Sequence, residues 1–145
     1  MKPPDLSDFA LEVLFTQARK TMELGQAIRH VLNEVDRLRC AGLRPEVVAI
    51  ANEVAARFNT TRAILLGRES KKALKRARVM AWWLLHFRYD LSYPTIGRAF
   101  GGRHHTTILL LTRAFAALVE RDPRLRRLLD EVEAAAWGEM QRRAA

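Results

Sequence analysis

A group of polar side chains able to hydrogen-bond to nucleic-acid bases and phosphates follows a pair of glycines near position 100. Residues 97–108 read Gly-Arg-Ala-Phe-Gly-Gly-Arg-His-His-Thr-Thr-Ile. Gly101 and Gly102 favour positive φ angles, which end one helix and let the next begin at a steep angle. The residues after the pair then form the first turn of a second helix, where free N–H groups and the helix dipole favour an anion. The pattern predicts a helix-turn-helix corner.

Three residues at the tip of this second helix are expected to reach base edges, namely His104, His105 and Thr106. Two adjacent histidines also suggest a metal site. However, side chains one residue apart on a helix diverge by about 100°, and no cysteine or third histidine lies near in sequence. No metal and no cofactor are therefore expected, and no nucleophile, base and orienting group occur close together, so the chain is not expected to be an enzyme.

The positive charge of the chain is concentrated next to this corner. The 145 residues carry a net charge of +9. Residues 67–113 hold 10 basic and 2 acidic side chains, residues 1–66 hold 9 and 8, and residues 114–145 hold 6 and 6. Because the release of counterions from phosphates drives association with cationic surfaces, this distribution predicts a nucleic acid as the partner.

The basic stretch that begins at Gly67 leads into a long predicted helix. Helical spacing directs its apolar residues to the core, namely Leu74, Ala77, Ala81 and Leu84, and spreads its cations over the more solvated sides. Those cations are Lys71, Lys72, Lys75, Arg76 and Arg78. An ordinary solvated charged face is the alternative, but such a face normally carries counter-charges, which are scarce here. Of the adjacent Trp82 and Trp83, one is expected to pack in the core and the other to lie in a groove or at an interface.

The other segments are also predicted to be helical, since no run alternates apolar and polar residues as a half-buried strand would. Ser7 is expected to cap a first helix, and a second carries an apolar stripe at Leu24, Ile28, Val31, Val35 and Leu38. A third helix begins near Pro45, and a short one covers residues 61–66. Ser92 and Pro94 begin a helix over residues 93–100. The last two helices are expected to bury Ile108, Leu111, Phe115 and Leu118, and then Leu125, Leu128, Leu129 and Val132.

These elements predict an all-α chain in which a helical domain with a helix-turn-helix unit follows a helical extension. The extension comprises residues 1–44, the domain residues 45–137 and a charged tail residues 138–145. The apolar stripe of the extension spans two heptads. It is expected either to dock against its own domain or to pair two copies, or to hold a partner protein.

The composition predicts a cytoplasmic, nucleoid-associated protein. A hydrophobic fraction of 49% supports a packed core, and no run approaches the ~20 apolar residues of a membrane span. No leader-like segment is evident at the N-terminus. The single cysteine, Cys40, cannot form an internal disulfide.

From Val47 to Val132 the sequence resembles the DNA-binding C-terminal domain of the DnaA replication initiators. Residues 102–108, Gly-Arg-His-His-Thr-Thr-Ile, are similar to the family signature Gly-Arg-Asp-His-Thr-Thr-Val. An Ala-Arg-x-x-Ala motif at residues 77–81 and a Leu-Ser-x-x-x-Ile-Gly-x-x-Phe motif at residues 91–100 precede it in the family's order.

The resemblance implies a role for individual residues. His105 and Thr106 would contact bases in the major groove, Pro94 would touch the same DNA site, and Thr107 and Arg78 would hold phosphates. The family's minor-groove loop corresponds to residues 68–72, where Ser70 replaces the family arginine. Either Arg68 or Lys71 would substitute for it, or minor-groove reading would be weaker. Further phosphate contacts are expected from Lys72, Lys75, Arg76 and Arg103. His104 replaces an aspartate that accepts from a cytosine amino group, so guanine or a phosphate is expected there instead.

Together these observations predict sequence-specific binding of double-stranded DNA that regulates replication or transcription. No Gly-x-x-x-x-Gly-Lys-Ser/Thr loop occurs, so the ATPase module of the initiators is expected to be absent. The alternative is a protein-interaction adaptor that keeps the fold, has lost recognition of the DNA site, and holds a partner through its N-terminal helices.

Overall fold

The computed structural model describes residues 8–21, 23–39 and 42–144. Within these ranges the chain forms eight helices and no strand, which confirms the all-α prediction. The chain divides into two compact units, Met1–Leu43 and Arg44–Ala145.

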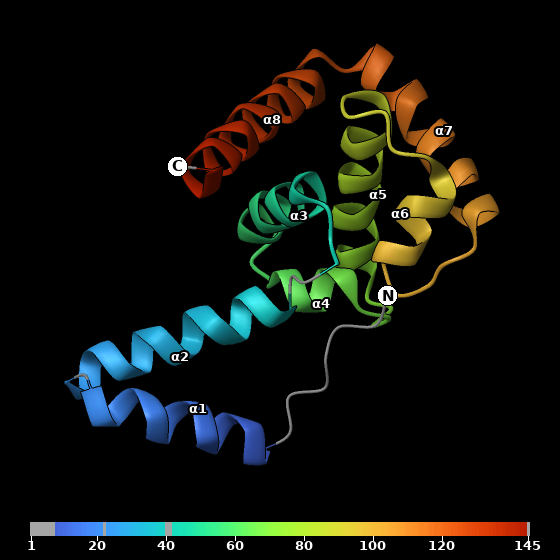
Figure 1. Cartoon of the computed structure of the whole chain (residues 1–145). Helices are drawn as coiled ribbons and strands as arrows, with labels where there is room; N and C mark the ends of the chain where they lie inside the picture. The colour runs from blue at the N-terminus through green and yellow to red at the C-terminus, as the bar shows by residue number, and fades with distance from the viewer. Residues whose placement is uncertain (1–7, 22, 40–41, 145) are drawn as a thin grey trace. The chain divides into compact units, whose positions relative to one another are not determined.

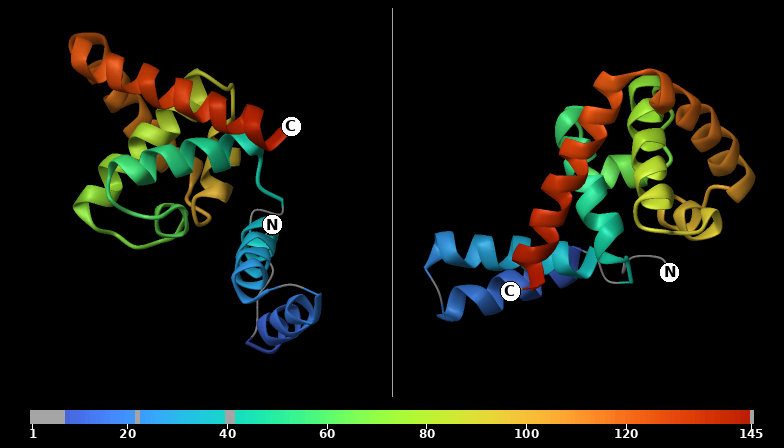
Figure 2. Two further views of the ribbon diagram at one scale, coloured as in Figure 1. Left: turned by 90° about the vertical axis from the view of Figure 1, so that its left-hand side faces the viewer. Right: turned by 90° about the horizontal axis from the view of Figure 1, so that it is seen from above.

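The first unit is a pair of helices, α1 (Asp8–Thr21) and α2 (Leu24–Arg39), which pack side by side (Figures 1 and 2). The predicted cap Ser7 lies outside the described residues. The pairing half-buries Val31, Val35 and Leu38 of the apolar stripe. Three further residues of α2 stay exposed, by 56% at Leu24, 43% at Ile28 and 61% at Leu32. Dimerisation or partner binding through this face stays a prediction.

The second unit contains six helices arranged around α5 (Lys72–Phe87). The others are α3 (Pro45–Arg57), α4 (Arg62–Leu66), α6 (Tyr93–Ala99), α7 (His105–Arg121) and α8 (Pro123–Ala144). Figure 1 shows α3 and α8 on one side of α5, and α6 and α7 on the other. This central position explains why ten of the sixteen residues of α5 are buried.

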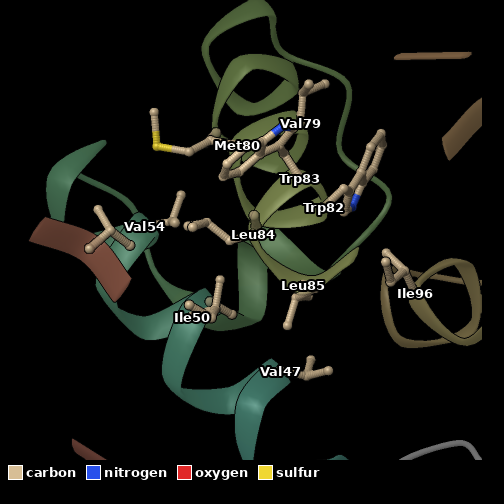
Figure 3. Close-up of a cluster of buried hydrophobic side chains, with 14 of the residues drawn as sticks. Val47, Ile50, Val54, Val79, Met80, Trp82, Trp83, Leu84, Leu85 and Ile96 are labelled. Atoms are coloured by element: carbon tan, nitrogen blue, oxygen red, sulfur yellow. The ribbon is translucent and has the colours of Figure 1, made fainter. Parts of the chain in front are cut away.

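The core of this unit joins α5 to its neighbours on both sides. In Figure 3, Ile50 and Val54 of α3 lie on the same side of α5 as Leu84, whereas Ile96 of α6 lies on the side of Trp82. One tryptophan was expected to pack and the other to lie in a groove or at an interface, but both pack, since Trp82 and Trp83 are 2% and 7% exposed. Trp82 also lines a pocket, so the expectation of a groove holds for it. The two tryptophans meet different partners.

Each tryptophan meets a phenylalanine edge to face. The ring of Trp82 lies 5.9 Å from that of Phe100, and the ring of Trp83 lies 6.3 Å from that of Phe115. Two adjacent indoles are therefore both buried because packed elements surround the helix that carries them.

Two expectations near the C-terminus are also wrong. Leu118 is 55% exposed, and the buried stripe of α7 runs through Ile108, Thr112 and Val119. Residues 138–144 are not a tail, because α8 continues to Ala144. The side chain of Asn52 donates to Glu139 Oε1 at 2.7 Å, and Met140 packs against the core, so contacts with α3 hold this last part of the helix.

Candidate nucleic-acid interface

The glycine corner between α6 and α7 has the predicted backbone conformation. Gly101 and Gly102 have φ angles of +76° and +71°, which confirms the expected positive values. Phe100, immediately before them, is fully buried and anchors the turn in the core. The Arg103 N–H donates to the Gly97 carbonyl oxygen at 2.9 Å, so the end of α6 and the start of α7 are joined across the turn.

The tip of α7 displays four polar residues in sequence. His104, His105, Thr106 and Thr107 are all exposed. His104 is the N-cap of the helix, and its Nδ1 accepts a hydrogen bond from the Thr106 N–H at 3.2 Å. The two imidazole rings stack with centroids 4.3 Å apart. The structure therefore brings the predicted base-contacting residues of this helix together on one accessible surface.

Two arginines join the loop between α4 and α5 to the glycine corner. Arg68 Nη1 donates to the Gly101 carbonyl oxygen at 2.6 Å. In return, Arg103 Nη2 donates to the Gly67 carbonyl oxygen at 3.2 Å. Each segment thus supplies one guanidinium and one carbonyl, and the basic loop is held beside the start of α7.

Arg78 does not lie on a solvated side of α5 as expected. Its side chain is 3% exposed. Nε donates to the Leu65 carbonyl at 2.8 Å, Nη2 donates to the Ile64 and Gly67 carbonyls at 3.0 Å each, and Nη1 donates to the Glu69 carbonyl. The guanidinium thus supplies donors to the Leu65 and Glu69 carbonyls. It shares the Ile64 carbonyl with the Gly67 N–H, and the Gly67 carbonyl with Arg103. In this structure Arg78 therefore shapes the loop, and its contact with a phosphate stays a prediction.

Burial and like charges around these arginines disfavour their charged forms. Desolvation lowers the pKa of Arg78, and the charge of Arg103 lowers it further. Desolvation likewise lowers the pKa of Arg103, with a second contribution from Arg68. The charge of Glu69 opposes this effect at Arg78. An anion bound nearby would offset the mutual repulsion of the arginines.

A pocket of about 390 Å³ opens beside the tip of α7. Its cationic lining comes from Lys71, Lys72 and Lys75 at the start of α5, together with Arg78 and Arg103. Thr107 contributes from α7, and Ser70, Trp82 and Leu111 complete the lining. None of the described residues that line the pocket is acidic. Its composition suits an anionic group.

Two buried N–H groups at this pocket have no hydrogen-bond partner within the described part of the chain. They are Trp82 Nε1 and Arg103 Nε. A buried donor without an acceptor costs about 1–3 kcal/mol. Both nitrogens are closed to solvent, so a ligand in the pocket would reach them only after the surrounding side chains move. Sequence reasoning did not assign Trp82 to the site. Its spacing was nevertheless a signal, because it follows Arg78 by four residues and Lys75 by seven, on one face of the helix.

The remaining predicted residues lie apart from the pocket lining. Arg76 is exposed on α5, next to Lys75 in sequence. Pro94 is exposed in the first turn of α6, whose predicted cap is confirmed, since Ser92 Oγ accepts from the Thr95 N–H at 3.3 Å. Arg68 is exposed and uses one N–H for the corner.

The described residues contain no group of three histidine, cysteine or acidic side chains that could hold a metal ion. In the same part of the chain, every helix is too short or too polar to cross a bilayer.

Comparison with known proteins identifies this arrangement. Residues 47–113 match the family described as bacterial dnaA protein helix-turn-helix. Relatives named chromosomal replication initiator protein DnaA include that of Bradyrhizobium sp. (strain BTAi1), which is 40% identical over 91 residues, or 63% of this chain and 18% of the relative. That of Caulobacter sp. (strain K31) is 33% identical over 115 residues, or 79% of this chain and 23% of the relative.

The protein of the same name from Pelobacter propionicus is 31% identical over 87 residues, or 60% of this chain and 19% of the relative. The chain thus matches about a fifth of the length of these relatives. The matched segment contains the glycine corner, the tip of α7 and the cationic start of α5. Residues 47–113 are therefore a helix-turn-helix domain of the bacterial DnaA type.

Proposed function

We propose that this chain binds double-stranded DNA in a sequence-specific manner and thereby regulates replication or transcription. The observation that carries the proposal is the exposed tip of α7, residues 104–107, next to a pocket with a cationic lining. In helix-turn-helix proteins the start of the second helix enters the major groove. Here α7 is that helix, and the bases would be read by His104, His105 and Thr106, with Pro94 of α6 beside them.

The pocket supports a phosphate contact on the DNA backbone. Lys71, Lys72 and Lys75 supply charge, while the Thr107 hydroxyl supplies a donor. Contacts of this kind fix the register of a protein on the duplex and carry no sequence information themselves. Arg103 belongs to this group, and Arg76 would add charge from the exposed side of α5.

The loop of residues 67–71 supports a second contact, in the adjacent minor groove or with its phosphates. Arg68 is exposed and its loop is tied to the glycine corner, so the start of α7 and this loop approach DNA together. Minor grooves attract arginine and lysine side chains most strongly where they are narrow. Arg68 and Lys71 are the residues we assign to this contact.

The names of the relatives favour a role at replication origins. A chain with this domain would occupy initiator-type sites or compete for them, which places it at the nucleoid. The proposal assigns no ATPase activity to these 145 residues, which contain no Gly-x-x-x-x-Gly-Lys-Ser/Thr loop.

The proposal is tested by selecting bound duplexes from a random pool and then measuring Kd against salt. For Z phosphate contacts, log K should fall with log salt with a slope of about −0.9Z. The selection should return one shared motif. Binding without a motif would contradict sequence specificity. The absence of salt-dependent binding by the folded chain would contradict the DNA-binding role and favour the adaptor alternative.

A further inference from the structure

We infer that His104 determines base specificity by presenting a single hydrogen-bond donor, so that it selects guanine and rejects cytosine. The inference rests on the proposed DNA-binding function and concerns one position of the DNA site. It follows from the helix cap, which uses the Nδ1 atom of His104 and leaves Nε2 for a ligand.

The cap fixes which nitrogen carries the proton. His104 Nδ1 accepts from the Thr106 N–H at 3.2 Å. A ring nitrogen that accepts a hydrogen bond carries no proton, and a neutral imidazole has one N–H, so the proton resides on Nε2. The only polar atom of the ring left for a ligand is therefore a donor.

The ring is also held in place, which lets one donor discriminate. The backbone of His104 is extended, with φ −66° and ψ 136°, as an N-cap requires. The neighbouring ring of His105 stacks on it at 4.3 Å with an interplanar angle of 30°. The cap bond and the stacked ring thus both restrain the exposed His104 side chain.

The edges of the four bases in the major groove respond differently to such a donor. Guanine presents two adjacent acceptors, N7 and O6, whereas adenine presents N7 beside an amino donor. Thymine presents O4, and cytosine presents an amino donor. Guanine therefore suits the Nε2–H best, and cytosine opposes it donor to donor. A phosphate oxygen would also accept, but that contact would produce no base preference.

Three substitutions of His104 distinguish the effect of the group that faces the base from the effect of the helix cap. Aspartate is a favoured N-cap, and it presents only acceptors, so His104→Asp should prefer cytosine. Asparagine can cap with its carbonyl oxygen and present its NH₂ group as a donor, so His104→Asn should keep the preference for guanine. Alanine removes both the cap and the contact, so His104→Ala should lose the preference.

The experiment uses the full chain and the motif selected by the wild-type protein. Kd is measured on every single-base variant of that motif, and the position whose preference His104→Ala abolishes is the one that His104 contacts. At that position we expect guanine to bind about 5- to 150-fold more tightly than cytosine. His104→Asp should reverse this ratio, and His104→Asn should retain its direction. Circular dichroism and thermal unfolding check that the variants fold.

Each result decides the matter. If the wild-type chain selects a motif but no position loses its preference in His104→Ala, or if His104→Asp and His104→Asn behave alike, the inference is wrong while the proposed function stands. Equal weakening on all sequences would mean that His104 contacts a phosphate, which also overturns it. If the wild-type chain binds no duplex, the proposed function itself fails.

Discussion

The backbones of Gly97 and Arg103 approach so closely that a β-carbon on Gly97 would lie 2.2 Å from the Arg103 carbonyl oxygen. The obstructing oxygen belongs to the backbone, so no flexible side chain can move aside. This approach determines how α7 leaves the glycine corner. The requirement for glycine at position 97 is therefore steric, and it does not come from the φ angle.

Gly97→Ala should destabilise the domain by about 1–3 kcal/mol, the usual cost of forcing extra atoms into a packed site. The free energy of unfolding in urea measures this. Gly138→Ala is a matched control in the interior of α8, where the added carbon would meet only the side-chain end of Arg142, at 3.3 Å. That variant should gain about 0.5–1 kcal/mol, because alanine favours a helix more than glycine does. Equal effects of the two variants would contradict the steric argument.

Arg78→Ala should lower the free energy of unfolding by at least about 1–3 kcal/mol, since it leaves buried carbonyls around the loop without a donor. Arg78→Lys should not restore stability, because one ammonium group cannot replace bonds to four carbonyls in this fork geometry. Arg76→Ala, at an exposed neighbouring cation, should change stability by less than about 0.5 kcal/mol. Unchanged stability of Arg78→Ala with weakened DNA binding would instead indicate a direct phosphate contact.

Substitutions at the tip of α7 should divide into two classes. His105→Ala and Thr106→Ala should each cost about 1–3 kcal/mol of binding on the selected motif and relax preference at one position. Thr107→Val removes a hydroxyl that lines the pocket and should weaken binding to all sequences by a similar factor. Kd values on the motif and on unrelated duplexes distinguish the classes. A Thr107→Val protein with altered preference would show that Thr107 also reads a base.

Lys72→Ala should weaken binding to every duplex and reduce the magnitude of the salt slope by about 0.9, the change expected for one lost phosphate contact. The control is Arg127→Ala, which removes an exposed cation of α8 that does not line the pocket. It changes net charge equally and should leave the slope unchanged. The same slope change in both variants would mean that general attraction, and not the pocket, holds the phosphate.

Much of the second unit follows from local patterns in the sequence. The apolar spacing of α5 places Leu74, Ala77 and Ala81 in the core as predicted. Ser92 caps α6 and the two corner glycines take positive φ angles because these preferences arise within a few residues. Such features need no knowledge of distant parts of the chain.

The environment of Arg78 could not be predicted in this way. Its position on α5 next to other cations suggests a solvated side, but the end of α4, distant from it in the sequence, places two carbonyls within reach of its guanidinium. That environment depends on tertiary geometry. The capping by His104 is local, since it joins residues two apart, but it was missed because histidine is not among the usual N-cap residues and its ring nitrogen takes the place of an oxygen.

Two hydrogen bonds, from Arg68 to Gly101 and from Arg103 to Gly67, affect both the affinity for DNA and the range of duplexes that can be bound. A loop already ordered in the free protein loses little conformational entropy when it enters a groove, so more of its interaction energy remains as affinity. The same rigidity fixes the separation between the loop and the start of α7, the two elements that we propose to enter neighbouring grooves. Duplexes that are overwound or underwound relative to that separation would have to deform to fit, so the mechanical properties of DNA outside the contacted bases would contribute to the choice of target.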